Sequence, residues 1–162
     1  MTIAPASTHE EIAGVRRLFQ EYAELLGVDL CFQGFADELA GLPGKYAPPE
    51  GALLIARQGQ AIAGCVALRN LGANVCEMKR LFVRPQFQGE GFGRALASAI
   101  VREGVNLGYQ AMRLDTLDRL KEAMNLYESL GFKRIAPYYP NPLPGVVYWE
   151  LPLAPLCHRR CA

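Results

Sequence analysis

The sequence predicts a mixed α/β protein of the α+β type, built on one central sheet. Three strand patterns follow one another closely between residues 52 and 83, and a helix pattern then leads to a further strand pattern over 111–116. Closely linked strands favour an antiparallel meander, whereas two strands joined through a helix favour a parallel pair. We therefore expect an antiparallel N-terminal meander that continues into a parallel pair, with helices flanking the sheet.

The N-terminal part predicts a strand over 2–5 and then a long helix that ends at Gly27. Thr8 and Glu11 have the spacing of a capping box, in which each side chain bonds the backbone amide of the other residue. Apolar residues recur after it with the period of a helix: Ile12, Val15, Leu18, Phe19, Tyr22, Leu25 and Leu26. A weaker helix pattern follows over 32–42.

The remaining elements are expected as strands over 52–56, 61–68, 75–83, 111–116, 132–136 and 146–153, and as helices over 94–107 and 120–130. Gly104 is expected to let the first of these helices pack closely on the sheet. Asp118 is expected to cap the second helix, and Gly131 to end it with a positive φ.

Length and composition indicate one domain over 1–155, followed by a tail over 156–162. A chain of 162 residues, 51% hydrophobic and 20% charged, is ordinary for a globular protein with its own core. The net charge of +1 argues against a nucleic-acid partner, and no apolar run approaches the ~20 residues that span a bilayer. The N-terminus has no signal-peptide pattern, so we expect a cytoplasmic protein without a membrane partner. A possible homodimer is left open.

The cysteines and histidines predict neither disulfides nor a metal site. The five cysteines are odd in number and show no CxxC spacing, which is typical of reduced thiols. Only two histidines occur, His9 and His158, so we expect no bound metal. Cys157, His158 and Cys161 lie together in the tail, where a disordered end is favoured over metal binding.

The stretch from Gln88 to Arg94 is the part of the sequence that most directly predicts a ligand. Three alternate glycines, Gly89, Gly91 and Gly93, lie where a strand pattern gives way to a helix pattern. Glycine lets a ligand approach the backbone without meeting a Cβ, and the first amides of a helix have no partner within it. Together with the helix dipole, these features are typical of a site for phosphate.

Two common phosphate motifs are excluded. The dinucleotide fingerprint needs a glycine where Arg94 stands, and the Gly-Lys-Ser/Thr triplet of nucleotide-triphosphate loops does not occur. The pattern Q/R-x-x-G-x-G/A, matched by Gln88, Gly91 and Gly93, resembles the acetyl-CoA pyrophosphate loop of the GNAT (N-acetyltransferase) superfamily.

The flanking segments strengthen this resemblance. Residues 81–85 resemble the family's strand ending, and 126–132 resemble its "LYEKLGF" segment. The resemblance is sharp from 77 to 132 and looser from 2 to 153. It implies a small, single-domain bacterial-type member with the element order β-α-α-β-β-β-α-β-α-β-β.

The resemblance also implies that acetyl-CoA is the cofactor. Backbone amides of the turn would hold its pyrophosphate, and the strand end would pair with its pantetheine arm like an added strand. The implied cofactor-binding residues are Leu81, Phe82, Val83, Gln88, Gly89, Glu90, Gly91, Phe92, Gly93, Arg94 and Ala123. From their side chains alone, Leu81 and Val83 would be core.

Two residues are implied to be catalytic. Tyr127 would be core by its helical position, but in the family the matching hydroxyl protonates the leaving CoA sulfur. Glu77, four residues before Leu81, matches a family carboxylate that accepts the proton of the amine. It could equally be a solvated charge or pair with Lys79 or Arg80.

Three further positions qualify the resemblance. Leu120 stands where many members carry an asparagine that contacts the cofactor, and Asn125 lies on a different helix face. Cys76 could form an acyl-enzyme, but neither histidine has a catalytic context, so we expect Cys76 to be core. Direct transfer in a ternary complex is therefore favoured.

The predicted function is transfer of acetyl from acetyl-CoA to a primary amine of a small molecule. The family's acceptor site would lie between 29–42 and 137–145. Its candidate contacts are Asp29, Asp37 and Glu38 for a cationic amine and Tyr138 and Tyr139 for stacking, with ordinary surface roles equally open. The alternatives are a protein or peptide N-terminal or lysine acetyltransferase, or a non-catalytic acyl-CoA-binding sensor.

Overall fold

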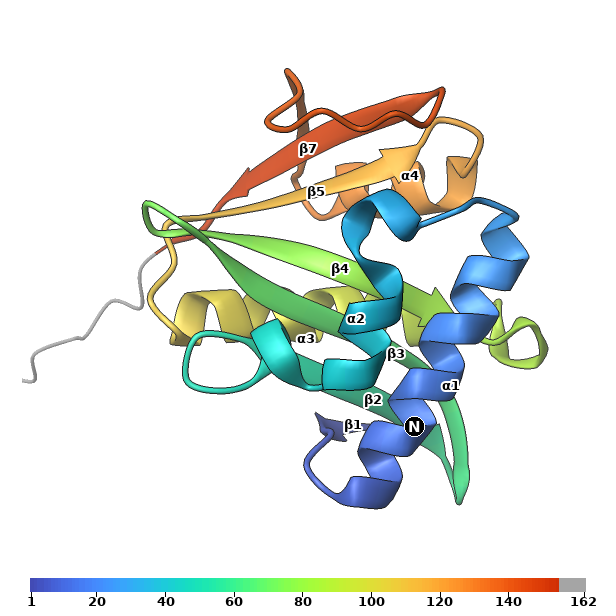
Figure 1. The fold of residues 1–162 in the computed structure, drawn as a ribbon. Coiled ribbons are helices and arrows are strands. Elements are labelled where there is room, and N and C mark those ends of the chain that lie inside the picture. The colour runs from blue at the N-terminus through green and yellow to red at the C-terminus, as the bar shows by residue number, and fades with distance from the viewer. Residues whose placement is uncertain (155–162) are drawn as a thin grey trace, which may run out of the picture.

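The computed structural model describes residues 1–154, which form one seven-stranded sheet in the order β1-β2-β3-β4-β5-β7-β6 (Figure 1). The strands are β1 (Thr2–Pro5), β2 (Ala52–Gln58), β3 (Ala61–Gly72), β4 (Val75–Val83), β5 (Ala111–Leu117), β6 (Lys133–Ile135) and β7 (Val146–Pro152). Among the paired strands, only β4 and β5 are parallel. The predicted fold class is confirmed, with an antiparallel N-terminal meander and one parallel pair.

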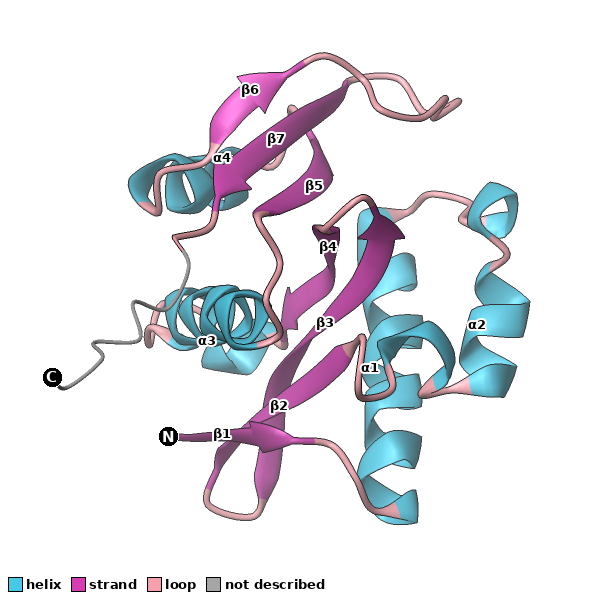
Figure 2. Cartoon of the chain, turned by 90° about the vertical axis from the view of Figure 1, so that its left-hand side faces the viewer, coloured by secondary structure: helices cyan, strands magenta, loops and turns pink. Residues whose placement is uncertain are grey.

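Helices cover both faces of the sheet. They are α1 (His9–Leu26), α2 (Phe35–Gly41), α3 (Phe92–Asn106) and α4 (Lys121–Ser129), with the short 3₁₀ turns η1 (Cys31–Gln33), η2 (Gly44–Tyr46) and η3 (Pro85–Phe87). Figure 2 shows α1 and α2 on one side of the sheet and α3 and α4 on the other. The predicted order of strands and longer helices is therefore also confirmed.

Each face of the sheet has its own apolar core. Helix α1 begins at the predicted capping box and buries Val15, Leu18 and Phe19 on one face. Helix α3 buries Leu96 and Ile100 on the other face. A fully buried leucine or isoleucine contributes about 1.5–3 kcal/mol to the free energy of folding.

Gly104 brings α3 close to the sheet, as the sequence predicts. A Cβ at this position would lie 3.1 Å from both Met112 Cε and Leu153 Cδ1. Such a distance is tighter than ordinary van der Waals contact, so these neighbouring side chains would have to shift by a few tenths of an ångström to admit a larger residue.

The sheet opens between β4 and β5, and this opening positions the site. The two strands pair over only three positions, from Val75–Ala111 to Glu77–Arg113. Beyond Glu77, β4 keeps pairing with β3 but contains an extra residue, and Arg80 there has a φ of +58°. A non-glycine residue in this left-handed region is uncommon, and a β-bulge of this kind bends a strand away from its neighbour.

Three predicted details differ from the structure. Helix α3 begins at Phe92 rather than 94, because Gly91 (φ +87°) is its N-cap. Strand β3 runs on to Gly72, where it pairs with Val75. Asp118 does not cap α4, whose N-cap Leu120 makes no side-chain cap hydrogen bond.

Asp118 instead meets the loop before β7. Its backbone amide donates to the Gly145 carbonyl at 2.8 Å, and a Cβ on Gly145 would lie 2.6 Å from its carboxylate. No helix in the described part of the chain is long and apolar enough to cross a membrane. The predicted tail, with Cys157, His158 and Cys161, lies outside the described residues.

Candidate active site

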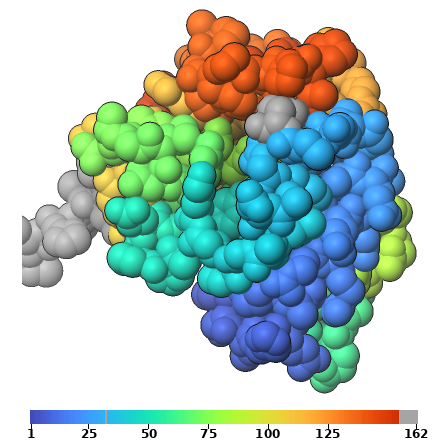
Figure 3. Space-filling view, viewed as in Figure 1, coloured from blue at the N-terminus to red at the C-terminus, as the bar shows by residue number. Residues whose placement is uncertain are grey.

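The first of two adjoining cavities lies at the opening between β4 and β5, and the second lies beside it, over β3 and β4 against α2 and η2. The inner cavity, of about 90 Å³, is lined by Leu81, Asp115, Ala123 and Tyr127 among others. The outer cavity, of about 480 Å³, is lined by Asp37, Glu38, Arg69 and Tyr139 among others. Gln33 and Lys79 line both, so they form the wall between the two cavities. Figure 3 shows this face of the molecule, where the cyan, green and orange-red segments meet.

The turn before α3 offers a row of free backbone donors. Among the described residues, no acceptor is found for the amides from Gly89 through Arg94. Gly89 and Gly91 have φ values of +83° and +87°, and both are exposed. Unpaired amides at the N-terminus of a long helix bind phosphate well, so these residues fit the pyrophosphate of acetyl-CoA.

The other residues of the turn are divided between surface and core. Gln88 donates from Nε2 to the Val83 carbonyl at 3.1 Å and so ties the turn to the end of β4. Arg94 is exposed, and its Nη2 donates to Ser129 Oγ at 2.9 Å. The Phe92 ring is buried, so at this position only the backbone can face a ligand.

The side chains of the predicted cofactor-binding residues on β4 and α4 point in different directions. Leu81 and Ala123 line the inner cavity. Val83 packs against the core on the α3 side, whereas Phe82 is buried on the α1 side with its ring edge against Tyr22. Side chains alternate across a strand, so Phe82 can offer only its backbone to the opening.

Tyr127 reaches the inner cavity from α4. Its side chain packs on the Phe132 ring and its residue surface is only 7% exposed. Among the described residues its hydroxyl has no hydrogen-bond partner, and the residue lines the inner cavity. Burial raises the pKa of Tyr127, so the hydroxyl keeps its proton at neutral pH and can act as a donor.

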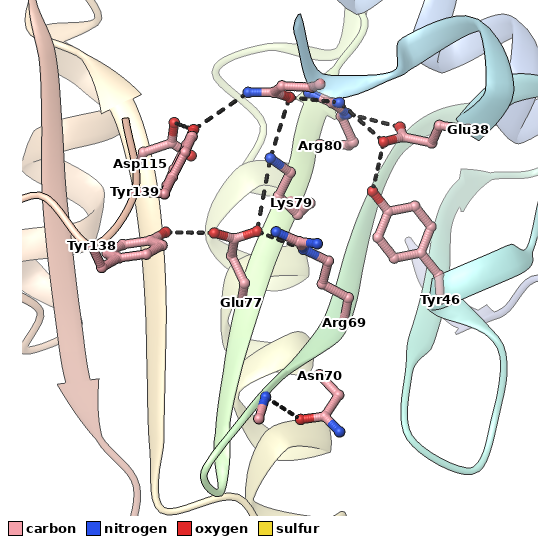
Figure 4. A network of polar contacts seen from close by, with 12 residues as sticks. Glu38, Tyr46, Arg69, Asn70, Glu77, Lys79, Arg80, Asp115, Tyr138 and Tyr139 are labelled. Atoms are coloured by element: carbon pink, nitrogen blue, oxygen red, sulfur yellow. Dashed lines mark hydrogen bonds and ion pairs between the residues drawn. The ribbon is translucent and has the colours of Figure 1, made fainter. Parts of the chain in front are cut away.

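Glu77 lies at the centre of a polar network on the α1 side of the sheet (Figure 4). It is 0% exposed and accepts from Arg69 Nε at 2.8 Å and from the Tyr138 hydroxyl at 2.5 Å. Lys79 Nζ lies 3.8 Å from its Oε1, so the pairing with Lys79 that the sequence allowed is present. Glu77 lines neither cavity, which favours an anchoring role over the predicted role as general base.

Asp115 is the carboxylate that faces the inner cavity, and the sequence reasoning missed it. It accepts from the Tyr139 hydroxyl and from Asn141 Nδ2, the latter at 3.1 Å. In the described part of the chain it has no ion-pair partner. Its signal was an acidic residue within a strand pattern, but only the fold shows that it lies on the same face as Glu77 and Lys79 (Figure 4).

The predicted acceptor residues are only partly brought together. Asp37 and Tyr139 line the outer cavity, but Asp29 lies outside both cavities and accepts from the Cys31 amide at 2.8 Å. Glu38 also lines the outer cavity, but its carboxylate is engaged by Arg80, with Nε–Oε2 at 3.0 Å. The cavity walls also carry the cations Arg69, Lys79 and Arg80, which the sequence analysis had not assigned to the acceptor site.

Cys76 is core, as predicted. It is 0% exposed, and its thiol donates to the Ala111 carbonyl at 3.6 Å. Burial raises the pKa of the Cys76 thiol to about 12, so the nucleophilic thiolate is scarce at neutral pH.

Comparison with known proteins agrees with this geometry. The protein-family model described as "Acetyltransferase (GNAT) family" matches residues 11–132. An uncharacterized N-acetyltransferase of Schizosaccharomyces pombe is 44% identical over 156 residues, which cover 95% of this chain and 96% of the relative. A protein named IAA acetyltransferase from Azospirillum brasilense is 32% identical, over 94% of this chain and 98% of its own length.

Solved structures show the same fold. An acetyltransferase from Streptococcus agalactiae has a TM-score of 0.78 at 20% identity, over 94% of this chain and 98% of its own. The protein yncA from Salmonella typhimurium, solved with its cofactor acetyl-CoA, has a TM-score of 0.74 at 18% identity and covers 100% of this chain and 99% of its own. The family match and the full-length relatives together establish that this chain belongs to the acetyltransferase (GNAT) family, whose enzymes take the acetyl group from acetyl-CoA.

Proposed function

We propose that the protein transfers the acetyl group of acetyl-CoA directly to a primary amine of a small molecule. One observation carries the proposal: Tyr127, whose hydroxyl has no hydrogen-bond partner among the described residues, lines the inner cavity at the strand opening. An unpaired, protonated hydroxyl is a suitable donor for a leaving thiolate.

The binding residues would divide as follows. The free amides from Gly89 through Arg94 would hold the pyrophosphate, and Leu81 and Ala123 would line the path of the thioester. When bound, acetyl-CoA supplies a thioester carbon that an uncharged amine can attack. The solved neighbour with acetyl-CoA supports this use of the fold.

Two proton movements fall to residues of the inner cavity. Asp115 would bind the amine and take its proton at a carboxylate oxygen, because it has no cationic partner among the described residues. Tyr127 would give its proton to the departing sulfur. Glu77 would hold Arg69 and Tyr138 in place rather than touch the amine.

Direct transfer is supported by the positions of the cysteines. None of the described cysteines, Cys31, Cys65 and Cys76, lines either cavity. A small acceptor is supported by the outer cavity of about 480 Å³. Small-molecule sites typically measure about 300–1,000 Å³.

The experiment is a screen of small primary amines with acetyl-CoA, read as free thiol released and as mass of the acetylated product. We expect turnover of at least one amine class, and no acetyl group on the protein after incubation with acetyl-CoA alone. Turnover only of peptides would favour the protein acetyltransferase alternative. Tight CoA binding without any turnover would favour the sensor, and an acetylated cysteine would overturn direct transfer.

A further inference from the structure

We infer that the acceptor is a small zwitterion, an α-amino acid or a close analogue, whose carboxylate is bound by Lys79 and Arg80. The inference rests on the proposed function and names its acceptor class. It follows from three observations: an under-partnered lysine, two cations that converge on one neutral oxygen, and the polarity of the wall between the cavities.

Lys79 is a buried cation with too few partners. Its side chain is 9% exposed, and its three N–H donors have a single hydrogen bond in the described structure, to Gln33 Oε1 at 3.3 Å. The Glu77 oxygen at 3.8 Å is beyond hydrogen-bond distance. Burial lowers the pKa of Lys79 despite the nearby carboxylates, so an anion in either cavity would stabilise its charge.

Arg80 converges on the same point. Its Nη2 donates to Gln33 Oε1 at 2.9 Å, beside the two bonds that its guanidinium makes with Glu38. A neutral amide oxygen thus accepts from two cations at the wall between the cavities. Those bonds are charge-assisted already, because both donors are ionised, and a carboxylate oxygen in that place would add the attraction of opposite charges to them.

The other end of the Gln33 amide is a hydrogen-bond donor rather than an acceptor. Gln33 Nε2 donates to the Tyr139 hydroxyl at 3.4 Å, and that hydroxyl donates to Asp115. The Gln33 amide therefore presents an acceptor to Lys79 and Arg80 and a donor toward Asp115. The carboxylate and ammonium groups of an α-amino acid have the same order, and Figure 4 shows Lys79 and Asp115 on one face of the sheet.

The charges of the network balance in number but are separated in space. It contains three cations and three carboxylates: Arg69, Lys79, Arg80, Glu38, Glu77 and Asp115. Arg80 pairs with Glu38 and Arg69 with Glu77, which leaves Lys79 with only the longer contact of 3.8 Å to Glu77 and Asp115 with no ion pair among the described residues. The outer cavity adds one acid and one base, Asp37 and Lys45, and so does not change this balance. A zwitterion suits both ends, whereas a simple amine suits only Asp115.

The test compares matched acceptors on the wild-type enzyme at saturating acetyl-CoA. Each α-amino acid is paired with its decarboxylated amine and with its carboxamide, and thiol release gives kcat/KM. We expect the amino acid to exceed both partners by at least tenfold for the preferred side chain. Equal or lower kcat/KM for the amino acids would overturn the inference while the proposed function stands, whereas no turnover of any amine would overturn both.

One variant tests whether Lys79 is responsible for the preference for acceptors that carry a carboxylate. Lys79→Met keeps the apolar stem and removes the charge, so the ratio between an amino acid and its decarboxylated amine should fall toward one. Lys133→Met, which removes an exposed lysine on β6, is the matched control and should keep the ratio. CoA affinity by calorimetry checks that Lys79→Met is folded, and a folded variant with an unchanged ratio would contradict the assignment. If the variant does not fold, the comparison of matched acceptors on the wild-type enzyme still tests the inference.

Discussion

The turn from Gln88 to Arg94 and the polar network around Glu77 are built in opposite ways. The turn is one continuous stretch that offers backbone amides and needs little from its side chains. The network depends on side chains from η1, α2, three strands and the loop before β7, and its Gln33–Tyr139 contact joins residues 106 positions apart. The proposed cofactor site can therefore be encoded by a short motif, whereas the proposed acceptor site depends on how the whole chain folds.

The largest effect is expected at Tyr127, which lines the inner cavity together with Asp115 of the network. Tyr127→Phe removes a hydroxyl that has no described partner, so packing should survive. General acid catalysis contributes roughly 10²–10⁴-fold, and a thiol with a pKa near ~8.5 leaves readily, so we expect kcat to fall about 100-fold. CoA affinity should change little.

Tyr109→Phe is the matched control for this loss of a hydroxyl. Tyr109 donates to the Glu50 carbonyl and lines neither the inner nor the outer cavity. We expect its kcat to match the wild type. An unaltered kcat in Tyr127→Phe, with chemistry shown to be rate-limiting, would return Tyr127 to a packing role.

The network should respond more in stability than in chemistry. Glu77→Gln leaves Arg69 and Lys79 without their shared carboxylate. Breaking a buried ion pair costs about 3–5 kcal/mol, and because Arg69 is 28% exposed we expect about 2 kcal/mol from denaturant unfolding. Glu150→Gln, which breaks the half-exposed pair with Arg113 at 2.7 Å, should cost no more than about 1 kcal/mol.

The pH dependence separates anchoring from base catalysis at Glu77. If Glu77 took the proton of the amine, the loss in Glu77→Gln would be greatest near neutral pH and would shrink at high pH, where the amine is already neutral. We expect instead a similar fractional loss of kcat/KM at every pH. A loss that high pH repairs would establish Glu77 as the base.

The smallest effect is expected in the turn itself. Gly91→Asp places a carboxylate beside the amides proposed to hold the pyrophosphate and strains a residue with φ +87°. We expect CoA affinity to fall at least ~10-fold, which is ~1.4 kcal/mol, by calorimetry. Gly108→Asp introduces the same residue at the same φ of +87° beyond the other end of α3, so it should lower stability but not affinity. Equal affinity in both variants would remove the turn from the site.

The sequence predicted the parts that are determined locally. Glycine spacing, a capping box and apolar periodicity each depend on neighbours within a few residues, and these gave the element order and the turn. The ion-pair partner of Glu77 could not be predicted in this way, because Arg69 lies opposite Glu77 only in the register that β3 and β4 adopt. A slip of one residue would put Arg69 on the other face. That register follows from the two-residue turn at Ala73 and Asn74 and from the bulges in the pairing, neither of which the sequence analysis identified. The failed cap at Asp118 has the same origin, since Gly145 approaches it from the loop before β7.

The bulge at Arg80 links the two regions. Its backbone, at φ +58°, is where β4 gains its extra residue, and its side chain is held by Glu38 and Gln33 on the acceptor side. We expect a ligand that tightens this hold also to favour the opening between β4 and β5, where the cofactor is proposed to bind. Reciprocity of binding free energies then requires that each substrate raise the affinity for the other by the same factor, whichever arrives first. Cooperativity between the two substrates would thus need only one residue of β4, and no moving domain.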